Sequence, residues 1–150
     1  TITVLDRLAR LGGFIDRRAQ ATVSGGFVER LGIRCPGDGV AADALSGGNQ
    51  QKVVLAKWLA RDCRVMVLDE PTRGIDVGAK LEMYRLINDL CRAGRAVILV
   101  SSELPEILSM CDRVYVMHGG AVVAELDADS ATQEEVLRHA SGLSLAARAA

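Results

Sequence analysis

Several features that are common in proteins are absent from this 150-residue chain or scarce in it. Aromatic residues make up only 3% of the sequence. No apolar run approaches the roughly 20 residues that are needed to cross a bilayer, so we expect any membrane association to go through a partner. Neither sign of charge dominates, since 18 basic residues stand against 19 acidic ones. This balance argues against the basic surface that binding to nucleic acid requires.

Paired cysteines and a phosphate-binding loop are also missing. The four cysteines show no CxxC spacing, which predicts reduced thiols in a reducing compartment. No G-x-x-x-x-G-K-[ST] motif occurs, so the glycine-rich loop that surrounds nucleotide phosphates is absent. The Gly-Gly pairs at 12–13, 25–26 and 119–120 lack the Lys-Ser or Lys-Thr that would follow such a loop. We interpret each pair as a turn or a helix break.

Two short motifs carry most of the chemical information. Residues 45–52 read LSGGNQQK, which places a hydroxyl and two glycines at the expected start of a helix. A glycine-rich helix start offers free N–H groups and positive partial charge to an anion. Residues 67–72 read VLDEPT and place two carboxylates after an apolar strand, where α/β proteins hold Mg²⁺ and activate water. Together the motifs predict half of a site for a nucleoside triphosphate.

The hydrophobic pattern predicts an α/β fold. Apolar residues at helical spacing indicate helices around 5–11 and 19–31, the second interrupted at Gly25-Gly26. Apolar strands at 65–68 and 96–100 should be parallel and covered on both faces, and Cys91 should lie in the core. We also expect helices at 46 to about 60, 83–91, 104–110 and 132 to about 140, a hairpin of strands 114–117 and 121–126, and a frayed end at 143–150.

The two motifs resemble those of ATP-binding-cassette (ABC) ATPases. Residues 45–52 look like the signature motif of that family, and residues 65–71 look like its Walker B strand. The longer sequence pattern, LSGGNQQK followed by DEPTRGIDVGAK, is similar to the second cassette of bacterial ATPases for ribose, xylose or galactose uptake. The likeness covers almost the whole chain. Because the chain opens on Thr1 and lacks the phosphate-binding loop, we expect it to be the C-terminal part of a longer polypeptide.

The resemblance implies a partial P-loop NTPase fold of the cassette type. Residues 1–62 would form a helical subdomain that carries the signature helix. Residues 63–150 would form the C-terminal part of the ATP-binding core, with parallel strands followed by a β-hairpin and a helix.

The resemblance also implies a nucleotide-binding role in trans for the signature. The hydroxyl of Ser46 and the amides that follow it would contact the γ-phosphate of ATP held by the opposite cassette. The implied nucleotide-binding residues are Ser46, Gly47, Gly48, Gln50 and Asp76. Without a side chain, a glycine lets the backbone come close to a phosphate. Ser46 and Asp76 also fit ordinary N-caps of the helices that follow them, and both roles can hold together.

Three further positions are implied to act in hydrolysis. Asp69 would hold Mg²⁺ largely through water, and Glu70 would polarise the attacking water as general base. A solvated strand end is the plainer alternative for both carboxylates. Many cassettes have His at the position of Ser102, which senses the γ-phosphate, and a serine hydroxyl never carries that positive charge. Second cassettes of sugar importers resemble this chain in having Ser there, so the hydrolytic strength of this half stays open.

The resemblance therefore implies the ATP-hydrolysing subunit of a bacterial sugar importer, which uses ATP and Mg²⁺. The implied partners are a paired cassette, the membrane permease and, indirectly, a periplasmic sugar-binding protein, with no nucleic acid. The location would be the cytoplasmic face of the inner membrane, through the permease. A basic side of the first helices is either a solvated face or a permease contact; it consists of Arg7, Arg10, Arg17 and Arg18.

Two rival functions remain at this point. A soluble ABC ATPase of DNA repair or translation would show a basic groove or a long coiled coil, and the near-neutral charge and the absence of sustained heptads count against it. A non-catalytic domain that dimerises on nucleotide binding is the other rival. The missing phosphate-binding loop and the serine at position 102 keep that alternative open.

Overall fold

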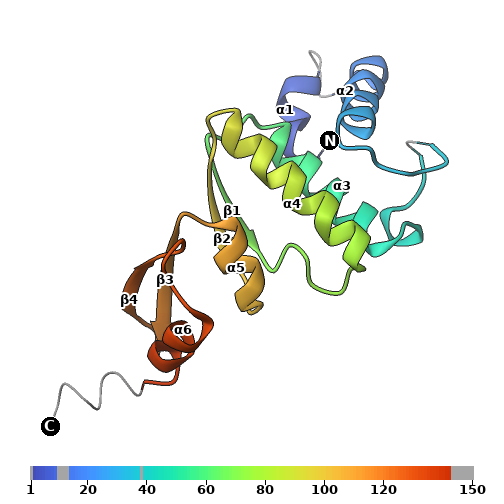
Figure 1. The fold of residues 1–150 in the computed structure, drawn as a ribbon. Coiled ribbons are helices and arrows are strands. Elements are labelled where there is room, and N and C mark those ends of the chain that lie inside the picture. The colour runs from blue at the N-terminus through green and yellow to red at the C-terminus, as the bar shows by residue number, and fades with distance from the viewer. Residues whose placement is uncertain (1, 10–13, 38, 143–150) are drawn as a thin grey trace, which may run out of the picture. The chain divides into compact units, whose positions relative to one another are not determined.

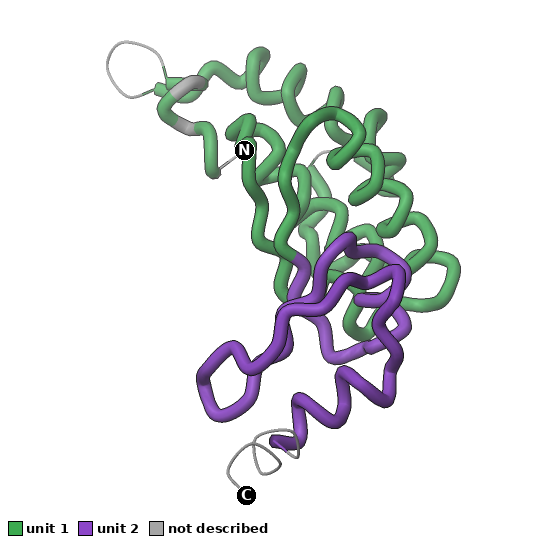
Figure 2. The backbone as a smooth tube through the Cα atoms, turned by 60° about the vertical axis from the view of Figure 1, so that its left-hand side comes forward, with its two compact units in different colours: residues 1–98 green, residues 99–150 purple. Residues whose placement is uncertain are grey.

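The computed structural model describes residues 2–9, 14–37 and 39–142. The chain divides into two compact units, Thr1–Ile98 and Leu99–Ala150 (Figure 2). Each unit is described on its own below. Leu11, Arg10 and the segment 143–150, which carried sequence-based expectations, lie outside the described residues.

The first unit consists mostly of helices, together with the two strands of a small sheet, the second of which continues into the second unit (Figure 1). Strand β1 (Val65–Asp69) pairs with β2 (Ala96–Val100) in a two-stranded parallel sheet, as the strand–helix–strand order predicted. The helices of this unit are α1 (Leu5–Leu8), α2 (Arg17–Arg30), α3 (Gly47–Leu59) and α4 (Val77–Arg92), with 3-10 turns at Ile2–Val4 and Ala42–Ala44.

Helix α2 runs unbroken through Gly25-Gly26, so the predicted interruption there is wrong. Each glycine lowers helix stability by about 1 kcal/mol relative to alanine but still permits helical backbone. The helix is fixed at both ends instead. The carboxylate of Asp16 accepts two N–H groups of the first turn at 3.0 and 3.1 Å, and Leu31 and Ile33 beyond the last turn are buried.

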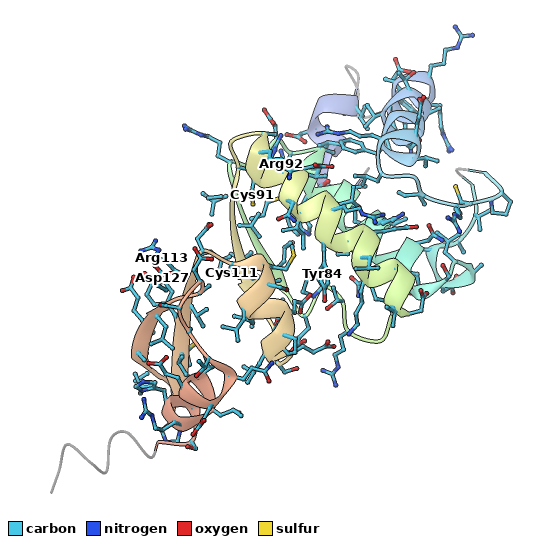
Figure 3. All side chains as sticks on the ribbon, in the orientation of Figure 1. Tyr84, Cys91, Arg92, Cys111, Arg113 and Asp127 are labelled. Carbon is cyan, nitrogen blue, oxygen red and sulfur yellow. The ribbon has the colours of Figure 1, made fainter. Side chains whose placement is uncertain are left out.

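Helix α4 supplies the clearest buried face of the first unit. Met83, Ile87 and Leu90 are buried at the i, i+4, i+7 spacing that the sequence predicted. Cys91 is exposed, so its expected place in the core is wrong. It lies about 100° around the helix from Leu90, beyond the edge of the buried stripe. Figure 3 shows Cys91 beside Arg92 at the C-terminal end of α4.

Strand β1 is buried on one face only, which corrects the prediction that both faces are covered. Met66 is 5% exposed, whereas its neighbours Val65 and Val67 are 59% and 65% exposed. Successive side chains of a strand point to opposite faces, and within the described residues only the Met66 face is packed. Ile98 on β2 is likewise 55% exposed.

The second unit contains α5 (Leu104–Met110), the hairpin β3 (Arg113–His118) and β4 (Ala121–Asp127), and α6 (Gln133–Ala140). The predicted hairpin is confirmed, and Gly119 and Gly120 turn it with φ of 57° and 81°. The predicted helix that starts near residue 132 is confirmed too, and Thr132 caps it, since Thr132 Oγ1 accepts the Glu135 N–H at 3.2 Å. The core of this unit consists of Ile107, Val114, Val116, Ala128 and Val136.

The α/β fold, with its parallel strands, hairpin and C-terminal helix, is therefore confirmed. The functional boundary near residue 62 stays a prediction. Within residues 2–9, 14–37 and 39–142, no helix combines the length and the apolar character that a membrane crossing demands.

Candidate functional site

The start of α3 carries the first group of predicted site residues. Ser46 is the N-cap residue, and α3 begins at Gly47. The predicted N-cap position is correct, but the Ser46 hydroxyl makes no capping hydrogen bond to the helix backbone. Ser46 and Gly47 are both exposed. The first N–H groups of a helix have no partner within it, so this helix start can offer them to an anion.

Gly47 and Gly48 let α3 begin close to the segment that precedes α4 and to the first turn of α4 itself. A Cβ added to Gly48 would lie 2.7 Å from Ala79 Cβ, and one added to Gly47 would lie 3.3 Å from Ile75 Cγ2. Asp76 belongs to that same segment and caps α4, because its Oδ1 accepts the Ala79 N–H at 2.9 Å. The structure thus brings the signature glycines and the segment of Asp76 together.

Gln50, a predicted nucleotide ligand, is half-buried and turned toward its own chain. Its Nε2 donates to the Leu45 carbonyl at 2.8 Å, which ties the lead-in segment to the first turn of α3. The contact of Gln50 with a nucleotide stays a prediction.

The predicted acids lie where β1 ends. Asp69 is the last residue of the strand and is exposed, and Glu70 follows with φ of +46°. For a residue with a side chain, this left-handed conformation costs roughly 1–2 kcal/mol, and such strain is concentrated at functional sites. Pro71 and Thr72 are buried, and Arg73 N donates to the Glu70 carbonyl at 3.2 Å. This tight turn holds two successive carboxylates at the strand end.

The chemistry of these acids fits Mg²⁺ held together with a nucleotide. Among the described residues, no cluster of three or more His, Cys, Asp or Glu side chains could hold a metal ion. Mg²⁺ is usually bound through one or two carboxylates, with water and substrate phosphates completing its coordination. Asp69 beside Glu70 supplies that small donor set. Its role as the magnesium residue stays a prediction.

Ser102, the third predicted catalytic position, belongs to the second unit. It is exposed and lies between β2 and α5. Its neighbour Ser101 accepts the Glu103 N–H through Oγ at 3.0 Å, which shapes the turn into α5. The catalytic role of Ser102 stays a prediction.

Sequence reasoning missed that Lys52, the last residue of the signature motif, is buried. Lys52 is 6% exposed, and its Nζ donates to the Gly32 carbonyl at 3.1 Å and to Glu82 Oε2 at 2.6 Å. The signal was present, because Lys52 shares the spacing of Leu55 and Leu59, the other large buried side chains of α3. A charged residue at a core position of a helix indicates a specific partner.

The Lys52 contact makes part of the stability depend on pH. The hydrogen bond from Lys52, and then its charge, lower the pKa of Glu82 below the ordinary value of 4.5. A carboxyl whose folded pKa is lowered stabilises the fold fully above 4.5, and this contribution is lost as pH falls through the folded value. We expect denaturant titrations to show a steeper acid loss of unfolding free energy for the wild type than for Glu82→Gln. Equal slopes would contradict the ion pair.

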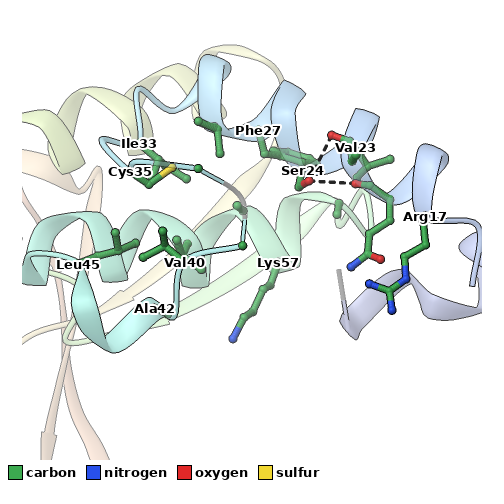
Figure 4. A pocket seen from close by; sticks show the side chains of 18 residues that line it. Arg17, Val23, Ser24, Phe27, Ile33, Cys35, Val40, Ala42, Leu45 and Lys57 are labelled. Atoms are coloured by element: carbon green, nitrogen blue, oxygen red, sulfur yellow. Dashed lines mark hydrogen bonds between the residues drawn. The ribbon is translucent and has the colours of Figure 1, made fainter.

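A pocket of about 380 Å³ opens between α2, α3 and the segment that joins them (Figure 4). Its lining is largely apolar and includes Phe27, Val40 and Leu45, while Ser24 Oγ donates to carbonyls of its own helix. The described residues that line this pocket include no residue of the predicted site. The pocket thus reaches Leu45 of the signature motif, but it contains none of the predicted ligands at the start of α3 and neither of the acids at the end of β1.

Comparison with known proteins gives a consistent result. Residues 26–73, which include the signature and both acids, match the family model described as ABC transporter. The chain is 53% identical over 131 residues to the ribose import ATP-binding protein RbsA 1 of Streptomyces avermitilis, covering 87% of this chain and 25% of that protein. It is 46% identical over 143 residues to RbsA 2 of Escherichia coli, covering 95% and 28%.

The chain thus spans about a quarter of the length of the curated relatives that it matches. Solved structures support the fold. One is a dimeric ATP-binding cassette in a post-hydrolysis state bound to ADP and Pi, with a TM-score of 0.66 at 19% identity, covering 80% of this chain and 52% of that one. Another is an inward-facing metal-chelate type ABC transporter, with a TM-score of 0.73 at 14% identity, covering 93% and 55%.

Proposed function

We infer that this chain, which matches the ABC transporter family model over residues 26–73 and is similar to ribose import ATP-binding proteins, forms the C-terminal part of a cassette that powers sugar import. The observation that carries this proposal is the start of α3. Its serine hydroxyl is not committed to capping, and Ser46 and Gly47 are exposed to solvent. This arrangement lies in a chain that is about half identical to ribose import proteins.

The proposed mechanism uses two composite sites. Ser46, Gly47 and Gly48 would donate to the phosphates of ATP held by a paired cassette. Asp69 and Glu70 would serve the nucleotide of their own cassette, with Glu70 taking a proton from the attacking water as general base. Mg²⁺ bound beside Asp69 would neutralise charge on the transferring phosphoryl group. Binding of ATP would close the two cassettes, and hydrolysis would release them.

The packing of α3 supports a link between the two sites. Because Gly47 lies against Ile75 and Gly48 lies against Ala79, a displacement of either segment would move the other. Through that contact, the nucleotide bound by this cassette would influence the position of the signature residues that bind the nucleotide of the paired cassette. Gln50 would fix the entry of the signature through its bond to the chain before it.

The proposed partners follow from the same assignment. A second cassette would complete each site, and a membrane permease would hold the pair at the cytoplasmic face of the membrane. A periplasmic binding protein would deliver the sugar to the permease. Arg17 and Arg18, exposed at the start of α2, are available for permease contact.

The test is sugar uptake by the complete polypeptide, reconstituted with its permease in vesicles that contain ATP and Mg²⁺. Uptake of a labelled monosaccharide should require ATP, and Asp69→Ala should lower it by about 100-fold or more, because charge stabilisation dominates phosphoryl transfer. Asp129→Ala, which changes an exposed aspartate of the second unit, is the matched control and should leave uptake unchanged. ATP hydrolysis with no sugar uptake for any monosaccharide would contradict the proposed function.

A further inference from the structure

Asn49 lies between the signature serine and a neighbouring loop. Its Nδ2 donates to Ser46 Oγ at 2.8 Å, and its Oδ1 accepts the backbone N–H of Arg34 at 2.8 Å. The two ends of an amide side chain are easily interchanged when its neighbours can both donate and accept. Here a backbone N–H can only donate, so Arg34 fixes the oxygen end and directs the NH₂ group at Ser46.

The loop that holds Asn49 is itself fixed. Lys52 Nζ donates to the Gly32 carbonyl at 3.1 Å, and Ile33 N donates to the Val28 carbonyl at 2.9 Å. Asn49 and Lys52 are three residues apart on α3 and therefore lie on one face of the helix. The same face of α3 is thus hydrogen-bonded to the loop at both Gly32 and Arg34. The NH₂ group of Asn49 is held in place by contacts outside the site.

The consequence for Ser46 is chemical. A serine hydroxyl has a single hydrogen to donate and lone pairs with which to accept. An N-cap serine ordinarily accepts a helix N–H, yet Ser46 makes no such bond and accepts from Asn49 instead. Accepting from an NH₂ group leaves the hydroxyl hydrogen available. Donation of that hydrogen to an ionised phosphate oxygen is the stronger, charge-assisted kind of hydrogen bond.

We propose that Asn49 is a positioning residue that holds the Ser46 hydroxyl as an acceptor, so that its only hydrogen is donated to a phosphate oxygen of the nucleotide on the paired cassette. The inference rests on the proposed function, because the nucleotide is supplied in trans. Asn49 itself need not touch the nucleotide. It acts through Ser46, and its effect should vanish when the hydroxyl is removed.

Two substitutions separate the parts of this role. Asn49→Ala removes both hydrogen bonds. Asn49→Asp keeps an oxygen for the Arg34 N–H but replaces the donor, so the Ser46 hydroxyl would turn its hydrogen to the carboxylate. We expect ATP turnover by the complete polypeptide to fall about tenfold in Asn49→Ala and further in Asn49→Asp. Asn88→Ala, at an exposed asparagine of α4, is the matched control and should leave turnover unchanged.

The decisive experiment is a double-mutant cycle with Ser46→Ala, measured as ATP turnover. Ser46→Ala alone should lower turnover by about 100-fold, as expected for loss of one transition-state donor. Asn49→Ala should then cost nothing more in the Ser46→Ala background, a result that a merely structural role would not give. If the Asn49→Ala protein does not fold, Asn49→Asp, which keeps the Arg34 contact, replaces it in the cycle.

Each other outcome overturns the inference in a recognisable way. If the Asn49 substitution lowers ATP turnover by the same factor with and without the Ser46 hydroxyl, Asn49 has a structural role and the proposed function stands. Full turnover in Asn49→Asp would lead to the same conclusion. Full turnover in Ser46→Ala would remove the trans contact itself, and the proposed use of the signature would fall together with the role of Asn49.

Discussion

The Glu70→Gln variant of the complete polypeptide should bind ATP normally and hydrolyse it at least about 100-fold more slowly than the wild type. Gln keeps the size and hydrogen-bonding shape of the side chain but cannot accept the proton of the attacking water. Glu70 occupies a strained left-handed backbone position directly after Asp69, the last residue of β1. The measurement is phosphate release in a single turnover, together with equilibrium binding of ATP.

The matched control for this variant is Glu134→Gln, which changes an exposed glutamate in the first turn of α6. It should turn over ATP at the wild-type rate. Unchanged turnover in Glu70→Gln would contradict the assignment of Glu70 as general base. That result would favour the rival in which nucleotide serves only to pair the domains.

The Gly48→Ala variant should lower the free energy of unfolding by about 1–3 kcal/mol and prevent ATP-dependent pairing of the cassettes. Its new methyl group would lie 2.7 Å from Ala79 Cβ, so α3 and α4 would have to move apart at their starts. The movement would displace the amides that follow Ser46 from the position set by the segment of Asp76. Chemical denaturation measures the first effect, and light scattering with ATP measures the second.

Gly25→Ala gives the matched control for Gly48→Ala. A Cβ at Gly25 has nothing within 4 Å, and the residue lies inside α2. Alanine there should raise the free energy of unfolding by about 1 kcal/mol, because it favours helix and restricts the unfolded chain. Equal stability of the two alanine variants, with pairing intact in both, would contradict the close packing of Gly48.

The elements that local chemistry determines could be predicted from the sequence. The cap at Thr132, the turn at Gly119-Gly120 and the buried stripe of α4 each depend on residues near one another in the chain. The misses depend on what packs against an element. Cys91 fits the helical spacing of the core but lies beyond the stripe that the neighbours cover, and one face of β1 is exposed. The periodicity of apolar residues shows which residues share one face of a helix or strand, but it does not show how much of that face is buried.

The candidate site divides in the same way. The motifs located Ser46, Asp69 and Glu70 because their residue types carry the chemistry. The contacts that hold this region in place could not be predicted, because Asn49 and Lys52 bond to backbone atoms 15 and 20 residues earlier in the chain. A polar residue on a predicted helix indicates that a partner exists. Only the fold shows that the partner of Asn49 is the Arg34 backbone.

The most direct test of a site shared between two cassettes is Mg²⁺-dependent ATP turnover by the isolated chain of residues 1–150, compared with the complete polypeptide. The isolated chain should show no turnover and no submicromolar affinity for ATP in calorimetry, whereas the complete polypeptide should hydrolyse ATP. Turnover at the full rate by the isolated chain, shown to be a monomer under the same conditions, would contradict the composite site.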